Sequence, residues 1–426
     1  MPHVCAVQRV SFHIHDPRTM KPSAVVSTFV LLAATACADA PEPDTTRIWT
    51  ERDSAGVTVV DNHVADLDDA GWSVGDEPRL VIGGLDAPDE TQLFQVDGAT
   101  RLADGRLAVG VAGSHDVRVF SPQGALLARF GTEGDGPGEF RDVTLLGRYG
   151  ADTLVVFDAS ASRITLLTPD GGVLGSVPVA WNGKGYPIGR DLLDDGSILV
   201  GGGMSFSSSE GFPTGVIRPL STFGWVDRQG ANMHALGDFA AAGMFARASS
   251  QGFMARGLPF TPVTTATAGR NGVWLGTGEH WEVRLYDLDG ALVRLVRADA
   301  EPRPVTPELR GAYEEEEVAD ASTGNEARQI RELLAEMPFP AYMPPYQLLV
   351  TDALGYLWAE AYLAPGETRP RWLVFDPWGH AVARLATPPR TRLLEIGADY
   401  VLGLSRDELD VETLTLWSLH RPPSAS

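Results

Sequence analysis

The sequence predicts an all-β fold made of six similar units, and three observations predict it. An aromatic residue precedes an apolar, strand-like segment at a recurring interval of 46 residues. Within each interval, four short apolar stretches alternate with turn residues, as in antiparallel strands joined by hairpins. The chain is also rich in turn formers, with 46 Gly and 30 Pro among 426 residues. Self-similarity at such a period is typical of repeat architectures.

The repeat is marked by five aromatics, which are Phe94, Phe140, Tyr186, Phe260 and Tyr346. The first two intervals are 46 residues each, and another 46 residues after the last aromatic reach Arg392. The two longer intervals, 74 and 86 residues, indicate insertions into the third and fourth units. We expect these aromatics to pack between neighbouring units, and a ligand cage is the alternative.

The first unit shows the internal pattern best. Its four predicted strands are VDGATRL (96–102), RLAVGVA (106–112), DVRVFSP (116–122) and ALLARFG (125–131). Glycines stand where tight hairpins need a positive φ angle, as in Asp104-Gly105 and Gln123-Gly124. Four antiparallel strands per repeat of this length are typical of a propeller blade. The sequence therefore predicts a six-bladed β-propeller of four-stranded antiparallel blades.

The last unit contains only three predicted strands, RLLEIG (392–397), DYVLGLS (399–405) and ETLTLWSL (412–419). Its outer strand is predicted near the other end of the chain, as PRLVIGG (78–84). An N-terminal strand would then close the ring and remove an open sheet edge. The predicted propeller spans residues 51–421, followed by a tail at 422–426.

The insertions are expected on the upper face, which we define as the end where the innermost strand of each blade begins. The third unit carries extra residues at 201–222 and 237–259. A small helical insertion is predicted between blades 4 and 5, at 299–345, and Thr306-Pro307 would begin its first helix. In the second helix an apolar stripe for docking is formed by Ile330, Leu333, Leu334 and Met337.

A family resemblance follows from particular segments. GTEGDGPGEF (131–140) resembles the blade linker of NHL-repeat-like propellers. RDSAGVTVVDN (52–62), LGYLWAEAYL (354–363), WLVFDPWGH (372–380) and YVLGLSRDELDVETL (400–414) resemble bacterial six-bladed β-propeller lipoproteins. The likeness covers roughly residues 50–421. It implies a fold and little about function, because one fold hosts unrelated activities.

The N-terminal segment is predicted to be a signal peptide. AVVSTFVLLAATA (24–36) is a 13-residue apolar run behind Lys21, too short to span a bilayer and suited to a signal sequence. Small residues precede Cys37, which resembles a bacterial lipobox in which the cysteine is lipidated, although Ala34 stands where Leu is usual. Residues 1–37 are thus the predicted signal peptide, with the start codon at Met1 or Met20 left open. Residues 38–50 are a predicted tether, and ordinary cleavage near residues 36–40 is the alternative.

The net charge and the cysteine content limit the kinds of partner and of cross-link that this chain can have. With 34 basic and 56 acidic residues the net charge is −22, which argues against nucleic-acid partners. The two cysteines, Cys5 and Cys37, allow no disulfide within the mature chain. We expect an exported cell-envelope lipoprotein that contacts the membrane through its lipid anchor.

Candidate ligand-binding residues are expected on the upper face, over the channel mouth, because the long insertions emerge there. They are Arg141, His280, Trp281, Tyr342, Tyr346 and Arg392. For Arg141, an ion pair with Glu139 or Asp142 is the alternative to anion binding. No nucleophile elbow, zinc motif, phosphate-binding loop or cysteine metal site occurs, so neither catalytic residues nor a cofactor are predicted.

The predicted function is a non-catalytic binding or assembly module for a protein or small-molecule ligand. The alternative is a propeller hydrolase or lyase of the gluconolactonase type. Such enzymes hold Ca²⁺ with carboxylates and amides from several inner strands, because this hard cation takes six or more oxygen ligands. Here the inner strands begin mainly with aromatics or Arg, which does not support a Ca²⁺ site.

Overall fold

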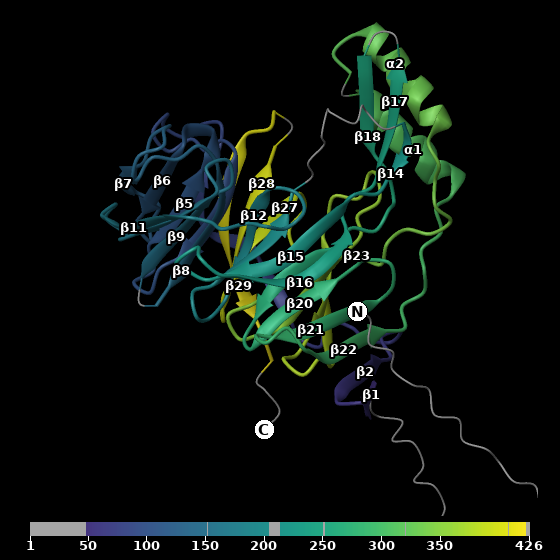
Figure 1. Cartoon of the computed structure of the whole chain (residues 1–426), viewed down its shortest axis with the longest axis horizontal. Helices are drawn as coiled ribbons and strands as arrows, with labels where there is room; N and C mark the ends of the chain where they lie inside the picture. Colours follow the sequence, from purple (N-terminus) through teal and green to yellow (C-terminus); the bar gives the residue numbers. More distant parts are fainter. Residues whose placement is uncertain are drawn as a thin grey trace, which may run out of the picture. The chain divides into compact units, whose positions relative to one another are not determined.

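The structure is a computed structural model that describes residues 48–422, except 151, 204–213, 250–251, 320 and 408. Cys37 and the predicted signal peptide lie outside the described residues. Within the described part, 29 strands form seven sheets, accompanied by two α-helices and one short 3-10 helix (Ala112–Ser114) (Figure 1). The mostly-β prediction is confirmed. No helix among these residues is long and apolar enough to cross a membrane.

Three sheets follow one another along the chain, and each has four antiparallel strands. The first contains β4 (Val96–Arg101), β5 (Leu107–Val111), β6 (Asp116–Phe120) and β7 (Leu126–Phe130). The second contains β8 (Val143–Tyr149), β9 (Thr153–Asp158), β10 (Arg163–Leu167) and β11 (Val173–Pro178). The third contains β12 (Pro187–Leu192), β13 (Ile198–Gly202), β15 (Leu220–Val226) and β16 (Met233–Ala240).

Two further sheets repeat the pattern, and one of them is larger than predicted. It contains β19 (Thr265–Gly269), β20 (Gly272–Gly276), β21 (Glu282–Asp287) and β22 (Leu292–Ala298). Two N-terminal strands extend it, β2 (Val57–Asn62) parallel to β22 and β1 (Trp49–Ser54) antiparallel to β2. The next sheet contains β23 (Tyr346–Thr351), β24 (Leu357–Ala361), β25 (Arg371–Phe375) and β26 (Ala381–Ala386).

The last four-stranded sheet joins distant parts of the chain. It contains β27 (Thr391–Ile396), β28 (Tyr400–Arg406), β29 (Glu412–His420) and β3 (Ser73–Gly83). β3 pairs antiparallel with β29, with Leu80 opposite Leu416 and Ile82 opposite Leu414. The segment predicted as this outer strand, 78–84, overlaps β3, which begins five residues earlier, at Ser73.

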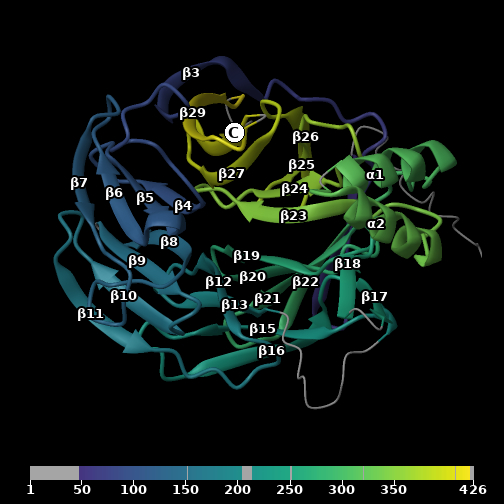
Figure 2. The same cartoon turned by 90° about the horizontal axis from the view of Figure 1, so that it is seen from above.

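The first strands of the six sheets adjoin one another in a cycle. β4 contacts β8, β8 contacts β12, β12 contacts β19, β19 contacts β23, and β27 contacts β4. At the remaining junction the amide of Ala353, just after β23, donates a 2.9 Å hydrogen bond to the carbonyl of Ile396 in β27. Figure 2 shows the sheets side by side around a common centre, as in a propeller. We call these six strands the inner strands.

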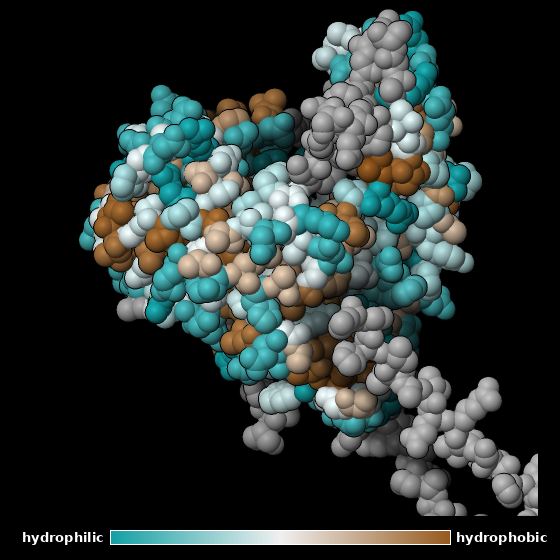
Figure 3. Space-filling view, viewed as in Figure 1, coloured by the Kyte–Doolittle hydropathy of each residue, from teal (hydrophilic) through white to brown (hydrophobic). Residues whose placement is uncertain are grey.

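Apolar residues on both faces of each sheet hold neighbouring sheets together. In β5 every residue is buried. Leu107 and Val109 pack towards Leu402 of the preceding sheet, whereas Ala108 belongs to a cluster with Leu154 of the following sheet. A strand buried on both faces reads as a continuous apolar run, which explains segments such as LAVGV. Hydrophilic residues dominate the surface seen in Figure 3, with apolar residues in scattered patches.

The recurring aromatics divide into two groups. Phe140, Phe260 and Tyr346 are buried, as expected for packing between units. The expectation is wrong for Phe94 and Tyr186, whose side chains are 59% and 50% exposed. These two rings instead pack closely on glycines at the surface. If Gly113 carried a Cβ atom, it would lie only 2.3 Å from the side chain of Phe94, and a Cβ on Gly203 would lie 2.4 Å from that of Tyr186.

The insertions form a three-stranded sheet and a helical pair. The sheet contains β14 (Gly215–Ile217), β17 (Met244–Ser249) and β18 (Gly252–Gly257) and was not predicted. The helices are α1 (Pro307–Ala319) and α2 (Gly324–Glu336). Both lie beside β17 and β18 in Figure 1.

Local contacts explain how this helical pair is held. The hydroxyl of Thr306 accepts a hydrogen bond from the amide of Leu309, 3.3 Å away, which confirms the predicted helix start. Ile330, Leu334 and Met337 pack against Leu258, which follows β18, so the apolar stripe docks within the molecule. Ion pairs join the strands to the helices, from Arg247 to Glu336 at 3.3 Å and from Arg256 to Glu317 at 3.5 Å.

Candidate functional site

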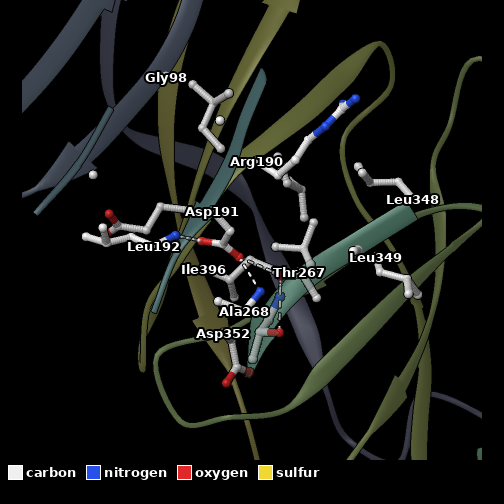
Figure 4. Close-up of a pocket in the computed structure, with 18 of the residues that line it drawn as sticks. Gly98, Arg190, Asp191, Leu192, Thr267, Ala268, Leu348, Leu349, Asp352 and Ile396 are labelled. Atoms are coloured by element: carbon white, nitrogen blue, oxygen red, sulfur yellow. Dashed lines mark hydrogen bonds between the residues drawn. The ribbon is translucent and has the colours of Figure 1, made fainter. Parts of the chain in front are cut away.

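The inner strands enclose a channel with a cavity of about 990 Å³. Residues from all six inner strands line it, from Asp97 and Gln347 at the upper end to Arg148 and Arg270 at the lower end. Figure 4 shows part of this wall, with side chains of several inner strands converging on one space.

β-Bulges in five inner strands help determine which side chains reach the channel. The strand pairing skips one residue in each, namely Asp97 in β4, Thr144 in β8, Arg190 in β12, Gln347 in β23 and Leu394 in β27. All five line the cavity. A bulge adds one residue that has no partner in the ladder, and it re-aims side chains. Four of the five skipped residues are polar, so these bulges place polar groups in the channel wall.

Four arginines line the channel, one each from or beside β8, β12, β19 and β27: Arg148, Arg190, Arg270 and Arg392. The side chains of the first three are exposed to the channel and form no hydrogen bond or ion pair with any residue that the structure describes. In Figure 4 the guanidinium of Arg190 points away from Asp191, with no interaction drawn to it. Desolvation by the surrounding protein lowers the pKa of Arg190, and the charge of nearby Asp97 opposes this shift.

Asp97 and Arg392 form a loose pair at the upper end. One guanidinium nitrogen of Arg392 lies 3.7 Å from the Asp97 carboxylate, and another donates a 2.6 Å hydrogen bond to the carbonyl of Val96. Burial raises the pKa of Asp97 to about 7, while the positive charge of Arg392 acts in the opposite direction. The Asp97 carboxyl therefore changes charge near neutral pH, next to two guanidinium groups.

Two other carboxylates join neighbouring inner strands and are not free to bind a ligand. Asp191 of β12 accepts hydrogen bonds from the Thr267 hydroxyl (2.6 Å) and the Ala268 amide (2.9 Å) of β19. Glu395 of β27 accepts hydrogen bonds from the Thr100 hydroxyl and, at 3.2 Å, from the amide of the next residue in β4. Burial raises the pKa of both carboxyls. Both Asp191 and Glu395 directly follow a bulge in their strands, and each carboxyl links its own sheet to a neighbouring one by hydrogen bonds.

Of the six predicted site residues, only Arg392 lines the channel. Arg141 lies outside it and is exposed, with its Nε 2.6 Å from a carboxylate oxygen of Asp135. Glu139 and Asp142 were the expected ion-pair partners, and both expectations are wrong. Glu139 instead accepts a 2.8 Å hydrogen bond from the amide of Gly136, within the turn that brings Asp135 towards Arg141.

His280, Trp281 and Tyr342 line a second cavity, of about 1120 Å³, outside the ring of inner strands. Tyr346 lines neither cavity. It is buried, with its hydroxyl donating to the carbonyl of Glu282 (2.8 Å) and its ring 5.2 Å from that of Trp281. The structure therefore divides the predicted site among the channel, the second cavity, the core and the surface.

The channel residues Asp97, Arg148, Arg190 and Arg270 were not predicted. The sequence does hold a signal for them, because each is a charged residue in or directly after an inner-strand segment such as YPIGRDLL (186–193). Among the described residues, no group of three His, Cys, Asp or Glu side chains could hold a metal ion.

The sheets cycling around a channel make this a propeller-type protein. No family model matches the chain, and no curated protein matches it. Similar solved structures include a Bacteroides fragilis protein described as exported, at 12% identity and TM-score 0.44, covering 85% of this chain and 99% of that one. A Bacteroides vulgatus member of the duf4221 family has 11% identity and TM-score 0.46, covering 83% and 100%. A Xanthomonas campestris gluconolactonase has 12% identity and TM-score 0.38, covering 83% and 98%.

Proposed function

We propose that this protein is an exported six-bladed β-propeller that binds an anionic ligand in its channel and does not transform it chemically. In this proposal the six sheets with inner strands are the blades, β3 completes the last blade, and α1 and α2 are inserted between the fourth and fifth. The observation that carries the proposal is Arg190, a guanidinium aimed into the channel without an ion-pair or hydrogen-bond partner among the described residues.

An anion satisfies this geometry better than a neutral or cationic ligand. The channel wall partly desolvates the guanidinium of Arg190, and hydrogen bonds or an opposite charge from a ligand would offset the cost of this desolvation. Its planar set of donors matches carboxylate and phosphate oxygens. Arg392 stands at the same channel, and Asp191 and Glu395 are occupied by hydrogen bonds to neighbouring strands. The channel thus carries accessible positive groups in a protein whose net charge is −22.

Asp97 favours a second candidate function, that of a hydrolase or lyase. A carboxyl with a pKa of about 7 suits general base catalysis near neutral pH. If the protein turns over a ligand, Asp97→Asn should abolish turnover and leave ligand binding within about twofold. Binding without turnover in the wild-type protein leaves the non-catalytic proposal standing.

Binding can be tested by isothermal titration calorimetry with citrate and with inorganic phosphate. Arg190→Gln should weaken binding about tenfold or more, because a hydrogen bond to a charged group contributes about 1.5–3 kcal/mol. Arg141→Gln is the matched control, since that exposed arginine lies outside the channel. Equal affinities of the two variants, or no binding of either anion to the wild type, would contradict the proposal.

We also propose that the protein is extracytoplasmic and anchored to the membrane by a lipid on Cys37. The support is the short apolar run at residues 24–36 and the small residues that precede the cysteine. Metabolic labelling with a palmitate analogue should mark the wild-type protein and not Cys37→Ala. Equal labelling of both would refute the anchor.

A further inference from the structure

We propose that the second cavity is a separate binding site for a small amphipathic anion. The flat apolar body of the ligand would lie against Trp281 and Tyr342, and its anionic group would bind Arg384. The two cavities share no lining residue, so this site is independent of the channel and of the function proposed for it.

The cavity lies at the upper ends of β24, β25 and β26. Its other walls are the segment 279–281 before β21, the segments 298–303 and 342–345 that flank the helical insertion, and residues 69–74 leading into β3. At about 1120 Å³ it exceeds what a small ligand needs, since pockets for drug-sized molecules measure about 300–1,000 Å³.

The aromatic walls are held in place by contacts beneath them. The Trp281 ring lies 5.2 Å from that of Tyr346, whose hydroxyl donates to the carbonyl of Glu282 and accepts from the amide of Gly278. Tyr342, 58% exposed, belongs to a proline-rich segment. The amide of the next residue, Met343, donates a 2.9 Å hydrogen bond to the carbonyl of Arg303. Such preorganisation lowers the entropy cost of binding.

Part of the remaining wall is apolar. Trp372 is buried and donates a 3.1 Å hydrogen bond to the hydroxyl of Thr387. Leu373 and Leu385 line the cavity from the same sheet, and Pro344 and Pro345 line it from the segment before β23. A concave apolar surface with a few polar groups is the usual form of a small-molecule site.

Among the described residues, one charged side chain that lines this cavity and has no ion-pair partner is an arginine. Four arginines line it, but Arg303 and Arg371 share the carboxylate of Glu367 at 2.8 and 3.1 Å. Arg369 donates to a backbone carbonyl. Arg384 is half-buried, and its guanidinium has no hydrogen-bond or ion-pair partner among the described residues.

The acidic groups of the same cavity do not neutralise Arg384. Glu279 and Glu301 are exposed at the rim, and Asp69 accepts a 2.9 Å hydrogen bond from the amide of Gly71. A ligand that combines an apolar ring with a carboxylate or sulfonate would therefore satisfy both the aromatic walls and the unpaired guanidinium.

Two fluorescent probes of the same shape test the charge requirement. 1-Anilinonaphthalene-8-sulfonate is anionic, and N-phenyl-1-naphthylamine is its neutral analogue. Trp281→Ala should weaken the binding of both probes about tenfold, because both use the aromatic wall. Arg384→Gln should weaken the anionic probe about tenfold and leave the neutral one within about twofold. Arg141→Gln, at an exposed position outside both cavities, is the control and should change neither.

Several outcomes would overturn this proposal. If Arg384→Gln leaves the affinity for the anionic probe unchanged, or affects both probes equally, no anion site exists there. If the wild-type protein dimerises in sedimentation experiments and Trp281→Ala abolishes the dimer, a second copy occupies the surface. Should Trp281→Ala lose its native circular dichroism, Tyr342→Ala provides the same test from an exposed position.

Discussion

Replacing Arg421 with alanine should destabilise the folded protein by about 3 kcal/mol. The guanidinium of Arg421 lies 2.8 Å from the carboxylate of Asp352, and the two side chains are 11% and 0% exposed. It also lies over the rings of Trp72 and Tyr356, at 4.7 and 5.4 Å from their centroids, and donates to the carbonyl of Gly397. One side chain therefore connects the segment before β3, the residue just after the end of β23 and the residue just after the end of β27.

The magnitude follows from the charge left behind. Removing one partner of a buried ion pair costs about 3–5 kcal/mol, because the other charge stays buried without compensation. Asp352 would retain hydrogen bonds from the amides of Leu354 and Tyr356 and from the indole of Trp358. This residual compensation places the expected loss at the lower end of that range.

Urea unfolding followed by tryptophan fluorescence measures this loss as the change in midpoint multiplied by the slope. Arg79→Ala is the control, because its ion pair with Asp399 is exposed (3.5 Å; 41% and 68%) and should contribute less than about 1 kcal/mol. Arg421→Lys should recover much of the loss, since it restores the charge without the planar stacking group. A loss for Arg421→Ala no larger than that for Arg79→Ala would refute the reasoning.

Three further predictions concern pH, the helical insertion and the ring closure. Burial raises the pKa of Asp97 and Glu360 to about 7, so between about pH 4 and pH 7 the folded state holds protons that the unfolded chain releases. The free energy of unfolding should therefore fall as pH rises through this window. In the double variant Asp97→Asn/Glu360→Gln the urea midpoint should depend less on pH. A pH dependence equal to that of the wild type would contradict both raised pKa values. Ile330→Ala, at a fully buried position in α2, should cost about 2–5 kcal/mol of local stability. Hydrogen exchange should then accelerate in α1 and α2 and not in β4 to β7, whereas uniform acceleration would mean that the insertion is not a separate unit. Deleting residues 73–83 removes β3 alone and should expose the edge of β29, giving aggregates on gel filtration; a monomer with unchanged melting temperature would contradict this.

The strands were predictable from sequence where apolar alternation and turn glycines act locally. The hairpin at Asp104-Gly105 is an example, since Gly105 has φ +88° between β4 and β5. The outer strand at residues 78–84 could be placed because the last repeat lacked one strand, although its partner β29 lies more than 300 residues away. That prediction depended on the local alternation of apolar residues and on the number of strands expected in each repeat.

The bulges could not be predicted, because a bulge is a property of register between two strands. VDGATRL (96–102) reads the same with or without the extra residue, and only the pairing with β5 shows that Asp97 is skipped. The same holds for Arg190 in β12. Asp97 and Arg190 are therefore charged channel residues whose strands the sequence indicated, although it did not indicate that their side chains reach the channel.

The three-stranded sheet and the β1–β2 extension were missed for a different reason. Segments such as MFARAS (244–249) contain few β-branched residues, and their partners lie in another insertion. β2 pairs in parallel with β22, so no hairpin turn in the sequence indicates that the two strands are neighbours. Non-local pairing of short, weakly patterned strands leaves little trace in a single sequence.

The pairing of β3 with β29 has a consequence for synthesis and folding. β3 ends at Gly83, whereas β29 begins only at Glu412. During synthesis this sheet can therefore be completed only after all the sheets between the two strands have been made, and until then β3 has no native partner. Long-range pairing of this kind slows folding and exposes strand edges during that delay. A chain that lacks either strand would therefore leave the edge of the other strand unpaired.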